Sequence, residues 1–128
     1  MIYKFRAWDK DNKYMEYTDK NLVVCFSNGG VDVVDHTTLM KNYELMMPTG
    51  LKDKNGVEIY VGDIIRGSYN TNIIGYDIVT IEVKEDLLKG FELEQFDLNN
   101  TEVLGNIYEN PELLKEYKLW LEKLERDQ

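Results

Sequence analysis

The sequence has few of the residues on which covalent cross-linking and catalysis depend. Its 128 residues include one cysteine, one histidine and two prolines. One cysteine excludes an intramolecular disulfide, and Cys25, which lies in an apolar run, is expected to be a buried and unreactive thiol. His36 follows two aspartates, but the chain has no Gly-x-Ser-x-Gly motif to supply a nucleophile. A hydrolase is therefore the least favoured function, and we expect no enzymatic activity.

Long hydrophobic runs and glycine-rich phosphate loops are also missing. No apolar run approaches the ~18 residues of a membrane span, and the first residues, Met-Ile-Tyr-Lys-Phe-Arg, lack the apolar core of a signal peptide. Neither Gly-x-Gly-x-x-Gly nor a Walker loop occurs. We expect a cytoplasmic protein without membrane contact or a cofactor.

Two clusters of acidic and amide residues, at positions 9–12 and 53–56, have some features of calcium loops. Both lack the third ligand before the glycine and the glutamate at the twelfth position that an EF-hand needs. The same residue types are preferred in tight turns. We therefore predict turns at both places and no metal site.

The charge of the chain is strongly acidic and unevenly distributed. The formal net charge is −9, from 24 acidic and 15 basic residues, which disfavours binding to a phosphate backbone. Residues 82–102 hold most of the acidic excess, so a nucleic-acid mimic that inhibits a host protein is one alternative function. Residues 1–13 are mildly basic, and Lys4, Arg6 and Trp8 would form the nucleic-acid surface of a second alternative. The simpler interpretation is that the strand alternates, with its aromatic residues in a core and Lys4 and Arg6 outside.

Short β-type segments fill most of the chain. Alternation predicts a hairpin from residue 3 to residue 17. Two β-rich runs predict a second hairpin from 22 to 34, turning at Ser27-Asn28-Gly29-Gly30. Residues 39–47 fit a short helix or a strand, and Pro48 ends either one. Turns at 53–56 and 61–63 flank a very short strand, and longer strands follow, with a bulge expected at Gln95. Closely spaced short strands predict a small barrel.

The last segment has the features of a helix. Asn110 can cap a helix start and Pro111 suits the first helical position. An apolar face then follows helical spacing, while Leu119 lies on the polar side. We expect this face to dock on the barrel or on another subunit, and its residues are Leu113, Leu114, Tyr117, Trp120, Leu121 and Leu124.

Three separated segments resemble one protein family. They are KFRAWD (4–9), TGLKDKNGVEIYVGDII (49–65) and GNIYENPELL (105–114), and their order and spacing resemble the YopX protein family of phages and prophages of Gram-positive bacteria. The resemblance implies an SH3-like barrel with extra N-terminal β-structure and a C-terminal helix, in subunits that form a higher homo-oligomer. It implies no catalytic residues.

The expected fold class is α+β, mainly β: an SH3-like small barrel with extra N-terminal β-hairpins and a C-terminal amphipathic helix. We expect one domain over 1–128, with N-terminal β-structure at 1–39, the barrel at 40–108 and the helix at 109–128. The favoured function is a phage or prophage accessory protein that binds itself and a host or phage protein. The two nucleic-acid alternatives stay open.

Overall fold

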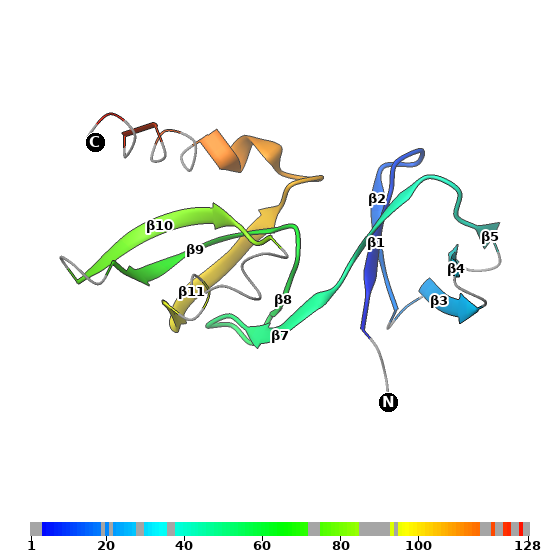
Figure 1. Ribbon diagram of the computed structural model, residues 1–128, viewed down its shortest axis with the longest axis horizontal. Helices are drawn as coiled ribbons and strands as arrows, with labels where there is room; N and C mark the ends of the chain where they lie inside the picture. The colour runs from blue at the N-terminus through cyan, green and yellow to red at the C-terminus, as the bar shows by residue number, and fades with distance from the viewer. Residues whose placement is uncertain are drawn as a thin grey trace. The chain divides into compact units, whose positions relative to one another are not determined.

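The computed structural model divides the chain into two compact units, Met1–Pro48 and Thr49–Gln128, here called unit 1 and unit 2 (Figure 1). It describes residues 4–18, 20, 22–27, 30–35, 38–71, 75–84, 93, 95–115, 119, 122–123 and 126, with only the backbone for 25–27 and 38. We expected the N-terminal β-structure to end at residue 39. Because β6 (Tyr43–Met46) pairs with β1, unit 1 extends beyond that position.

The first sheet of unit 1 confirms the predicted N-terminal hairpin. β1 (Arg6–Asp9) pairs antiparallel with β2 (Tyr14–Tyr17) on one side and with β6 on the other. The segment that fitted either a helix or a strand is therefore β-structure. β1 is the central strand, and Phe5, Arg6 and Ala7 at its start are all buried.

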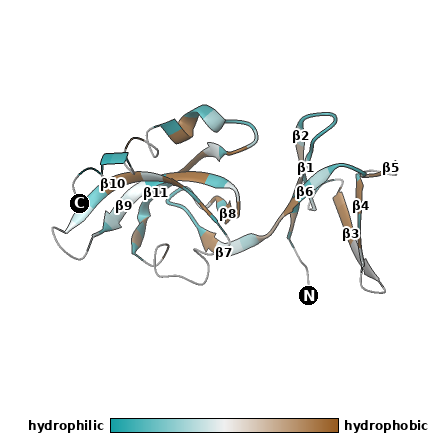
Figure 2. Cartoon of the chain, turned by 45° about the horizontal axis from the view of Figure 1, so that its top comes forward, coloured by the Kyte–Doolittle hydropathy of each residue, from teal (hydrophilic) through white to brown (hydrophobic). Residues whose placement is uncertain are grey.

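The second sheet of unit 1 is the predicted second hairpin with a short third strand. β3 (Leu22–Ser27) pairs with β4 (Gly30–Asp35), which also pairs with β5 (Thr38–Leu39). Figure 2 shows β3 and β4 as largely hydrophobic strands. A small core forms in unit 1 from the buried side chains of Ala7, Leu22, Val33 and Met40.

Unit 2 begins with the predicted pair of turns around a very short strand. β7 (Pro48–Lys52) pairs with β8 (Glu58–Tyr60), and the turn between them places Gly56 at a φ of 77°. Positive φ is accessible to glycine at little cost. A second turn, with Gly62 at a φ of 95°, leads into the next strand.

The main sheet of unit 2 has the order β10-β9-β11. β9 (Asp63–Asn70) is central, between β10 (Tyr76–Glu82) and β11 (Phe96–Asn106). Its larger core has seven buried side chains, namely Ile59, Ile65, Val79, Ile81, Val83, Leu93 and Phe96. The β11 register shifts between Asp97 and Thr101 and between Val103 and Gly105, so the irregularities lie inside β11 rather than at Gln95, which precedes it.

The mainly β character is confirmed, whereas the barrel is not. Within the described ranges the pairings give four open sheets, and none closes on itself. β8 has only three residues, which gives it few groups with which to bridge one sheet to another. The described strands therefore form open antiparallel sheets, each with two edge strands.

The C-terminal segment starts at the predicted residue, but the predicted side-chain cap is not formed. A short 3₁₀ helix, η1 (Pro111–Leu113), begins with Pro111 at its first position. The Asn110 side chain does not cap it; its oxygen accepts a hydrogen bond from the Asn106 backbone N at 3.3 Å. Asn110 thus fixes the turn before the helix.

Candidate binding site

The expected basic and aromatic surface at the N-terminus is not assembled. Lys4 is exposed and Trp8 is half-buried, but Arg6 is only 3% exposed. The simpler expectation, that Lys4 and Arg6 both lie outside, is therefore also wrong for Arg6. A phosphate cannot reach the guanidinium that was expected to anchor this surface.

The turn after β1 is held by one carboxylate. Asp9 Oδ1 accepts hydrogen bonds from the backbone N of Asp11 and of Asn12, both at 3.0 Å, and Oδ2 accepts one from Asn12 Nδ2 at 3.0 Å. These bonds confirm the predicted turn chemistry. The backbone hydrogen bond from Asn12 lowers the pKa of Asp9 and outweighs the burial that raises it, with help from the Asn12 side chain and Asp11. Asp9 is therefore charged near neutral pH.

A second carboxylate faces this turn from the other sheet of unit 1. The Tyr14 hydroxyl in β2 donates a hydrogen bond to Asp35 Oδ2 at the end of β4. This hydrogen bond, together with burial and the charges of Asp35, Asp9 and Glu16, raises the pKa of Tyr14 to about 12. Tyr14 thus stays protonated and joins the two sheets.

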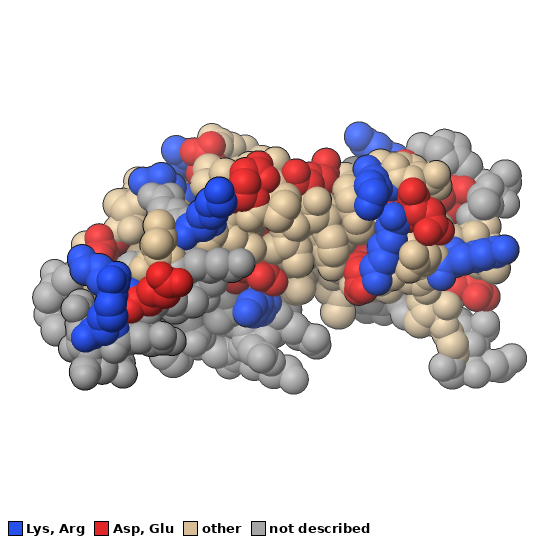
Figure 3. Space-filling view, turned by 90° about the horizontal axis from the view of Figure 1, so that it is seen from above, with Lys and Arg blue, Asp and Glu red and all other residues tan. Residues whose placement is uncertain are grey.

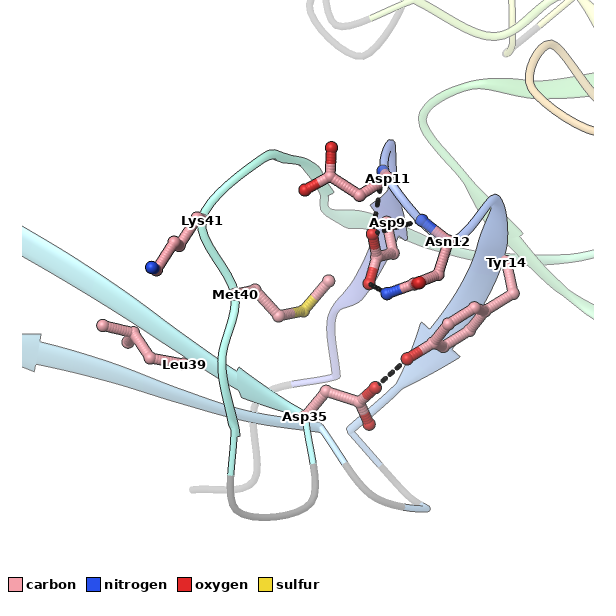
Figure 4. Close-up of a pocket in the computed structure, with 8 residues that line it drawn as sticks. All are labelled: Asp9, Asp11, Asn12, Tyr14, Asp35, Leu39, Met40 and Lys41. Carbon is pink, nitrogen blue, oxygen red and sulfur yellow. Dashed lines mark hydrogen bonds between the residues drawn. The ribbon is translucent and has the colours of Figure 1, made fainter.

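These groups border a hollow of about 450 Å³. It lies between the β1–β2 turn and the segment around β5, as Figure 4 shows. Asp35, Tyr14 and Met40 come from three separate elements, so local sequence patterns could not have assembled them. The lining residues are Asp9, Asp11, Asn12, Tyr14, Asp35, Leu39, Met40 and Lys41.

Apolar side chains form a row across the outer face of the second sheet. Val23 pairs with Val34, and Val34 pairs with Leu39, so the three side chains lie on one face of β3, β4 and β5. Val23 is 53% and Leu39 is 52% exposed, and Val34 is half-buried. This outer row was not predicted, although the uninterrupted apolar run of β3 contained the signal, because such a run places apolar side chains on both faces of a strand.

The segment 49–65 forms the turns that its sequence predicted. Asp53 Oδ1 accepts bonds from the backbone N of Asn55 at 2.8 Å and of Val57 at 2.9 Å, and Oδ2 accepts one from Val103 N at 2.9 Å. Asp63 Oδ2 accepts one from Tyr60 N at 2.8 Å. Both aspartates are buried, and they tie turns to strands.

The other predicted functional residues are only partly described. Leu113 and Leu114 are half-buried, and Leu119 is 62% exposed, as expected of its polar side. The remaining members of the helix face, Tyr117, Trp120, Leu121 and Leu124, lie outside the described residues, as do His36 and the Cys25 side chain. The docking role of that face stays a prediction.

The acidic segment 82–102 is described in part, and some of its charge has local partners. Asp97 accepts hydrogen bonds from Asn99 N at 3.1 Å and Asn100 Nδ2 at 2.7 Å, and Glu102 pairs with Lys54 at 3.2 Å. On the face seen in Figure 3, acidic and basic side chains are interspersed. An acidic mimic would need a larger surface of one sign.

Two further observations concern only the described part of the chain. It contains no group of three His, Cys, Asp or Glu side chains placed to hold a metal ion. No helix within it has the length and apolar character that a membrane crossing requires.

Comparison with known proteins decides the family. The YopX protein family matches residues 4–115, which is most of the chain. The chain belongs to the YopX protein family. The crystal structure of protein EF1440 from Enterococcus faecalis is similar at 28% sequence identity, covering 90% of this chain and 99% of that one, with a TM-score of 0.44. A search of curated proteins gives no match.

Proposed function

We propose that this YopX-family protein is a non-enzymatic accessory protein of a phage or prophage that self-assembles and binds a further macromolecule in the host cytoplasm. The resemblance to phage and prophage proteins suggests the setting. The observation that carries self-assembly is the outer row of Val23, Val34 and Leu39, which presents apolar surface on a regular sheet face. Exposed contiguous apolar surface marks interaction sites in soluble proteins.

Burial of this row favours a symmetric contact. Covering an exposed valine or leucine completely contributes roughly 1.5–3 kcal/mol, and these side chains are already about half covered. In an isologous dimer each copy buries the same patch, so the contribution of the row is doubled. The row would then form the apolar centre of an interface that neighbouring polar residues complete.

The charge distribution supports a contact through unit 1. Unit 1 has six basic and seven acidic residues, whereas unit 2 has nine basic and seventeen acidic residues. Two copies that meet through unit 2 would bring more like charge together than a contact through unit 1, so a contact through unit 2 needs apolar area to offset the repulsion. Unit 1 is close to neutral, so its outer row can meet a second copy with little repulsion.

The C-terminal segment is the second proposed contact. Leu113 and Leu114 are half-buried at the start of a segment whose pattern predicts an amphipathic helix. We include this helix and the SH3-like arrangement of unit 2 in the proposal, as the family resemblance implies. A truncation after Asn110 that kept both native mass and solubility would remove the helix from the assembly.

Native mass tests self-assembly directly. Light scattering after size exclusion should give an oligomer for the wild type at ~100 µM, and a smaller species for the double variant Val23→Glu/Leu39→Glu, because glutamates at the contact repel. The matched control is Leu51→Glu/Val57→Glu, which adds the same charge at two exposed apolar positions of unit 2. A monomeric wild type, or an equal effect of both double variants, would contradict the proposed contact.

Capture from host lysate tests the binding role. The tagged protein is captured from nuclease-treated and untreated halves of one lysate, and co-purifying species are identified by mass spectrometry and gels. A stoichiometric protein that remains after nuclease treatment supports a protein partner. Recovery of the protein alone from host and phage-infected lysates would contradict binding to a further macromolecule and leave self-assembly as the proposed function.

The two nucleic-acid alternatives have weaker support. The buried Arg6 removes the central cation of the binding surface, and the described acidic side chains of 82–102 are partly engaged with neighbours. A salt-dependent fluorescence titration with single-stranded DNA distinguishes the first alternative, since phosphate contacts weaken steeply as salt rises.

A further inference from the structure

We propose that the hollow of unit 1 binds a guanidinium or primary ammonium group carried on an aliphatic stem. The proposal goes beyond self-assembly and does not depend on it, although Leu39 belongs to both the outer row and the lining of the hollow. It stands on the volume of the hollow, on the hydrogen-bonding state of the groups that line it, and on the separation of its polar and apolar walls.

The volume suits a ligand or an inserted side chain. Ligand pockets span ~300–1,000 Å³, and this hollow has about 450 Å³. Its walls come from the β1–β2 turn, β2, the end of β4 and the segment 39–41. Two of these walls are joined by the Tyr14–Asp35 hydrogen bond, so the hollow is bordered by groups with fixed positions.

The hydrogen bonds around the hollow show which ligand chemistry can be satisfied. The donors at its wall already donate to its carboxylates: the Tyr14 hydroxyl to Asp35, and the Asn12 side-chain and backbone N–H groups to Asp9. A carboxylate has about four acceptor sites, and Asp11, which accepts a bond from Asn42 Nδ2 at 3.2 Å, retains acceptor capacity. A ligand that donates hydrogen bonds therefore fits better than one that accepts them.

The charge of the hollow selects a cation. Three carboxylates line it, and the one lysine at its border, Lys41, extends its amine away from them (Figure 4). Asp9 and Asp35 are each at least nine-tenths buried, and charges act more strongly at such depth than in water. The three carboxylates would repel an anion, whereas they would attract a guanidinium or ammonium group.

The opposite wall accounts for the aliphatic stem. The Met40 side chain extends into the space facing Asp9, and Leu39 also lines the hollow, with its side chain directed away from the carboxylates (Figure 4). Thioether and aliphatic groups pack against methylene chains, and long cationic side chains typically bury their stems in this way. An arginine or lysine side chain of a partner protein and a free alkyl cation share this chemistry.

The test is a titration of the full chain with matched cationic and neutral probes. Butylguanidinium is compared with butylurea, its uncharged isostere, and the peptide acetyl-Gly-Arg-Gly-amide with the same peptide carrying citrulline. Calorimetry gives Kd, and backbone NMR signals of Asp11, Asn12 and Lys41 report the location. We expect each cation to bind at least about tenfold more tightly than its neutral partner, which corresponds to about 1.4 kcal/mol.

Single-charge variants locate the site. Asp11 is exposed, so Asp11→Asn should fold normally and weaken binding of the cation about threefold to tenfold. Asp35→Asn keeps an acceptor for Tyr14 and should weaken binding further. The control is Asp32→Asn, which removes one exposed carboxylate of β4 outside the hollow and should leave Kd unchanged.

The titrations decide whether the site binds cations and, if it does, which kind of molecule carries the cation. Equal affinity for charged and neutral probes, or an equal loss in Asp32→Asn and Asp11→Asn, would overturn the proposal. If the arginine peptide binds more tightly than butylguanidinium, the natural source is a protein side chain; the reverse order indicates a free alkyl cation. The native mass of Asp11→Asn should match the wild type, so a failure of this site is distinguishable from a failure of self-assembly.

Discussion

Asp53 in unit 2 and Asp35 in unit 1 are equally buried, at 7% exposure each, but their carboxylates have different surroundings. Asp53 accepts three backbone N–H groups from two distant parts of the chain. Asp35 accepts a side-chain hydroxyl and borders a hollow beside two further carboxylates. A carboxylate enclosed by backbone amides stabilises the fold, whereas a carboxylate at the wall of a hollow adds its negative charge to the field inside that hollow.

The units also differ in core and charge. Unit 2 has the larger buried cluster and the larger excess of acidic residues, while unit 1 has a small core and is nearly neutral. A larger core offsets the self-repulsion of a charged unit. The comparison predicts that single changes to buried polar groups cost more stability in unit 2 than in unit 1.

Removal of the Asp53 carboxylate should have the largest effect. Asp53→Ala leaves the backbone N–H groups of Asn55, Val57 and Val103 without their acceptor, and the loss should total about 3 kcal/mol of unfolding free energy. Urea unfolding followed by circular dichroism measures this. Asp77→Ala, at an exposed aspartate of β10, is the control and should change stability by less than about 0.5 kcal/mol.

Acid titration gives a second measure of the same group. Burial raises the pKa of Asp53, but the hydrogen bonds from Val103, Val57 and Asn55 and the charge of Lys54 together hold it below 3.8. Because the folded pKa is lowered, this stabilisation is present above pH 3.8 and is lost as the pH falls through the folded pKa. Asp53→Asn should therefore show a shallower loss of stability in acid than the wild type; parallel curves would contradict the role of the charge.

A close approach of two strands in unit 2 should give the next largest effect. A Cβ on Gly67 in β9 would lie 2.8 Å from the backbone Cα of Thr101 in β11, so Gly67→Ala forces the strands apart at about 2 kcal/mol. Gly50→Ala is the comparison, because Gly50 has a φ of +81° but open space around it. Its cost should be about 1 kcal/mol. Equal costs in thermal unfolding would show that β11 shifts freely.

Much of the β-structure could be predicted because its signal is local. Alternation predicted the first N-terminal hairpin, and β-rich runs around an Asn-Gly turn predicted the second. The turn residues at 53–56 and 61–63 predicted the boundaries of β8. The bulge was misplaced because Phe96 and Leu98 break the alternation, while the shift itself depends on how β11 pairs with β9. Register between distant strands has no local sequence signal.

The candidate site was largely hidden for the same reason. Asp9, Asp11 and Asn12 were recognised as a turn, and that interpretation is confirmed. Tyr14 and Asp35, which are 21 residues apart, meet only through the packing of two sheets. The pairing of β6 with β1 similarly joins distant parts of the chain, and the ambiguous segment 39–47 did not reveal it.

The Tyr14–Asp35 hydrogen bond should contribute less than the Asp53 contacts. Tyr14→Phe removes one donor from a buried carboxylate and should cost about 1 kcal/mol. The pKa of Tyr14 is raised from 10.0 to about 12, so its stabilisation is complete below pH 10 and disappears as the pH rises towards 12. Tyr76→Phe, at a tyrosine that is 63% exposed, is the control. A variant as stable as wild type at pH 8 would show that the sheets of unit 1 pack without this bond.

Removal of a surface ion pair should have the smallest effect on the free energy of unfolding, and this effect should be the same in both units. Lys54–Glu102 in unit 2 spans 3.2 Å and Lys10–Glu44 in unit 1 spans 2.6 Å, with all four side chains 40–46% exposed. Exposed pairs of this kind contribute less than about 1 kcal/mol because water and salt screen them. Lys54→Met and Lys10→Met should each lower the unfolding free energy by less than about 0.5 kcal/mol in 0.15 M salt. Lys54 also donates its backbone N–H to Thr101 O at 2.9 Å, beside the Asp53 carboxylate. A loss above about 1 kcal/mol for Lys54→Met alone would mean that its side chain holds β11 against the 53–56 turn, and that the difference between the units extends to their surfaces.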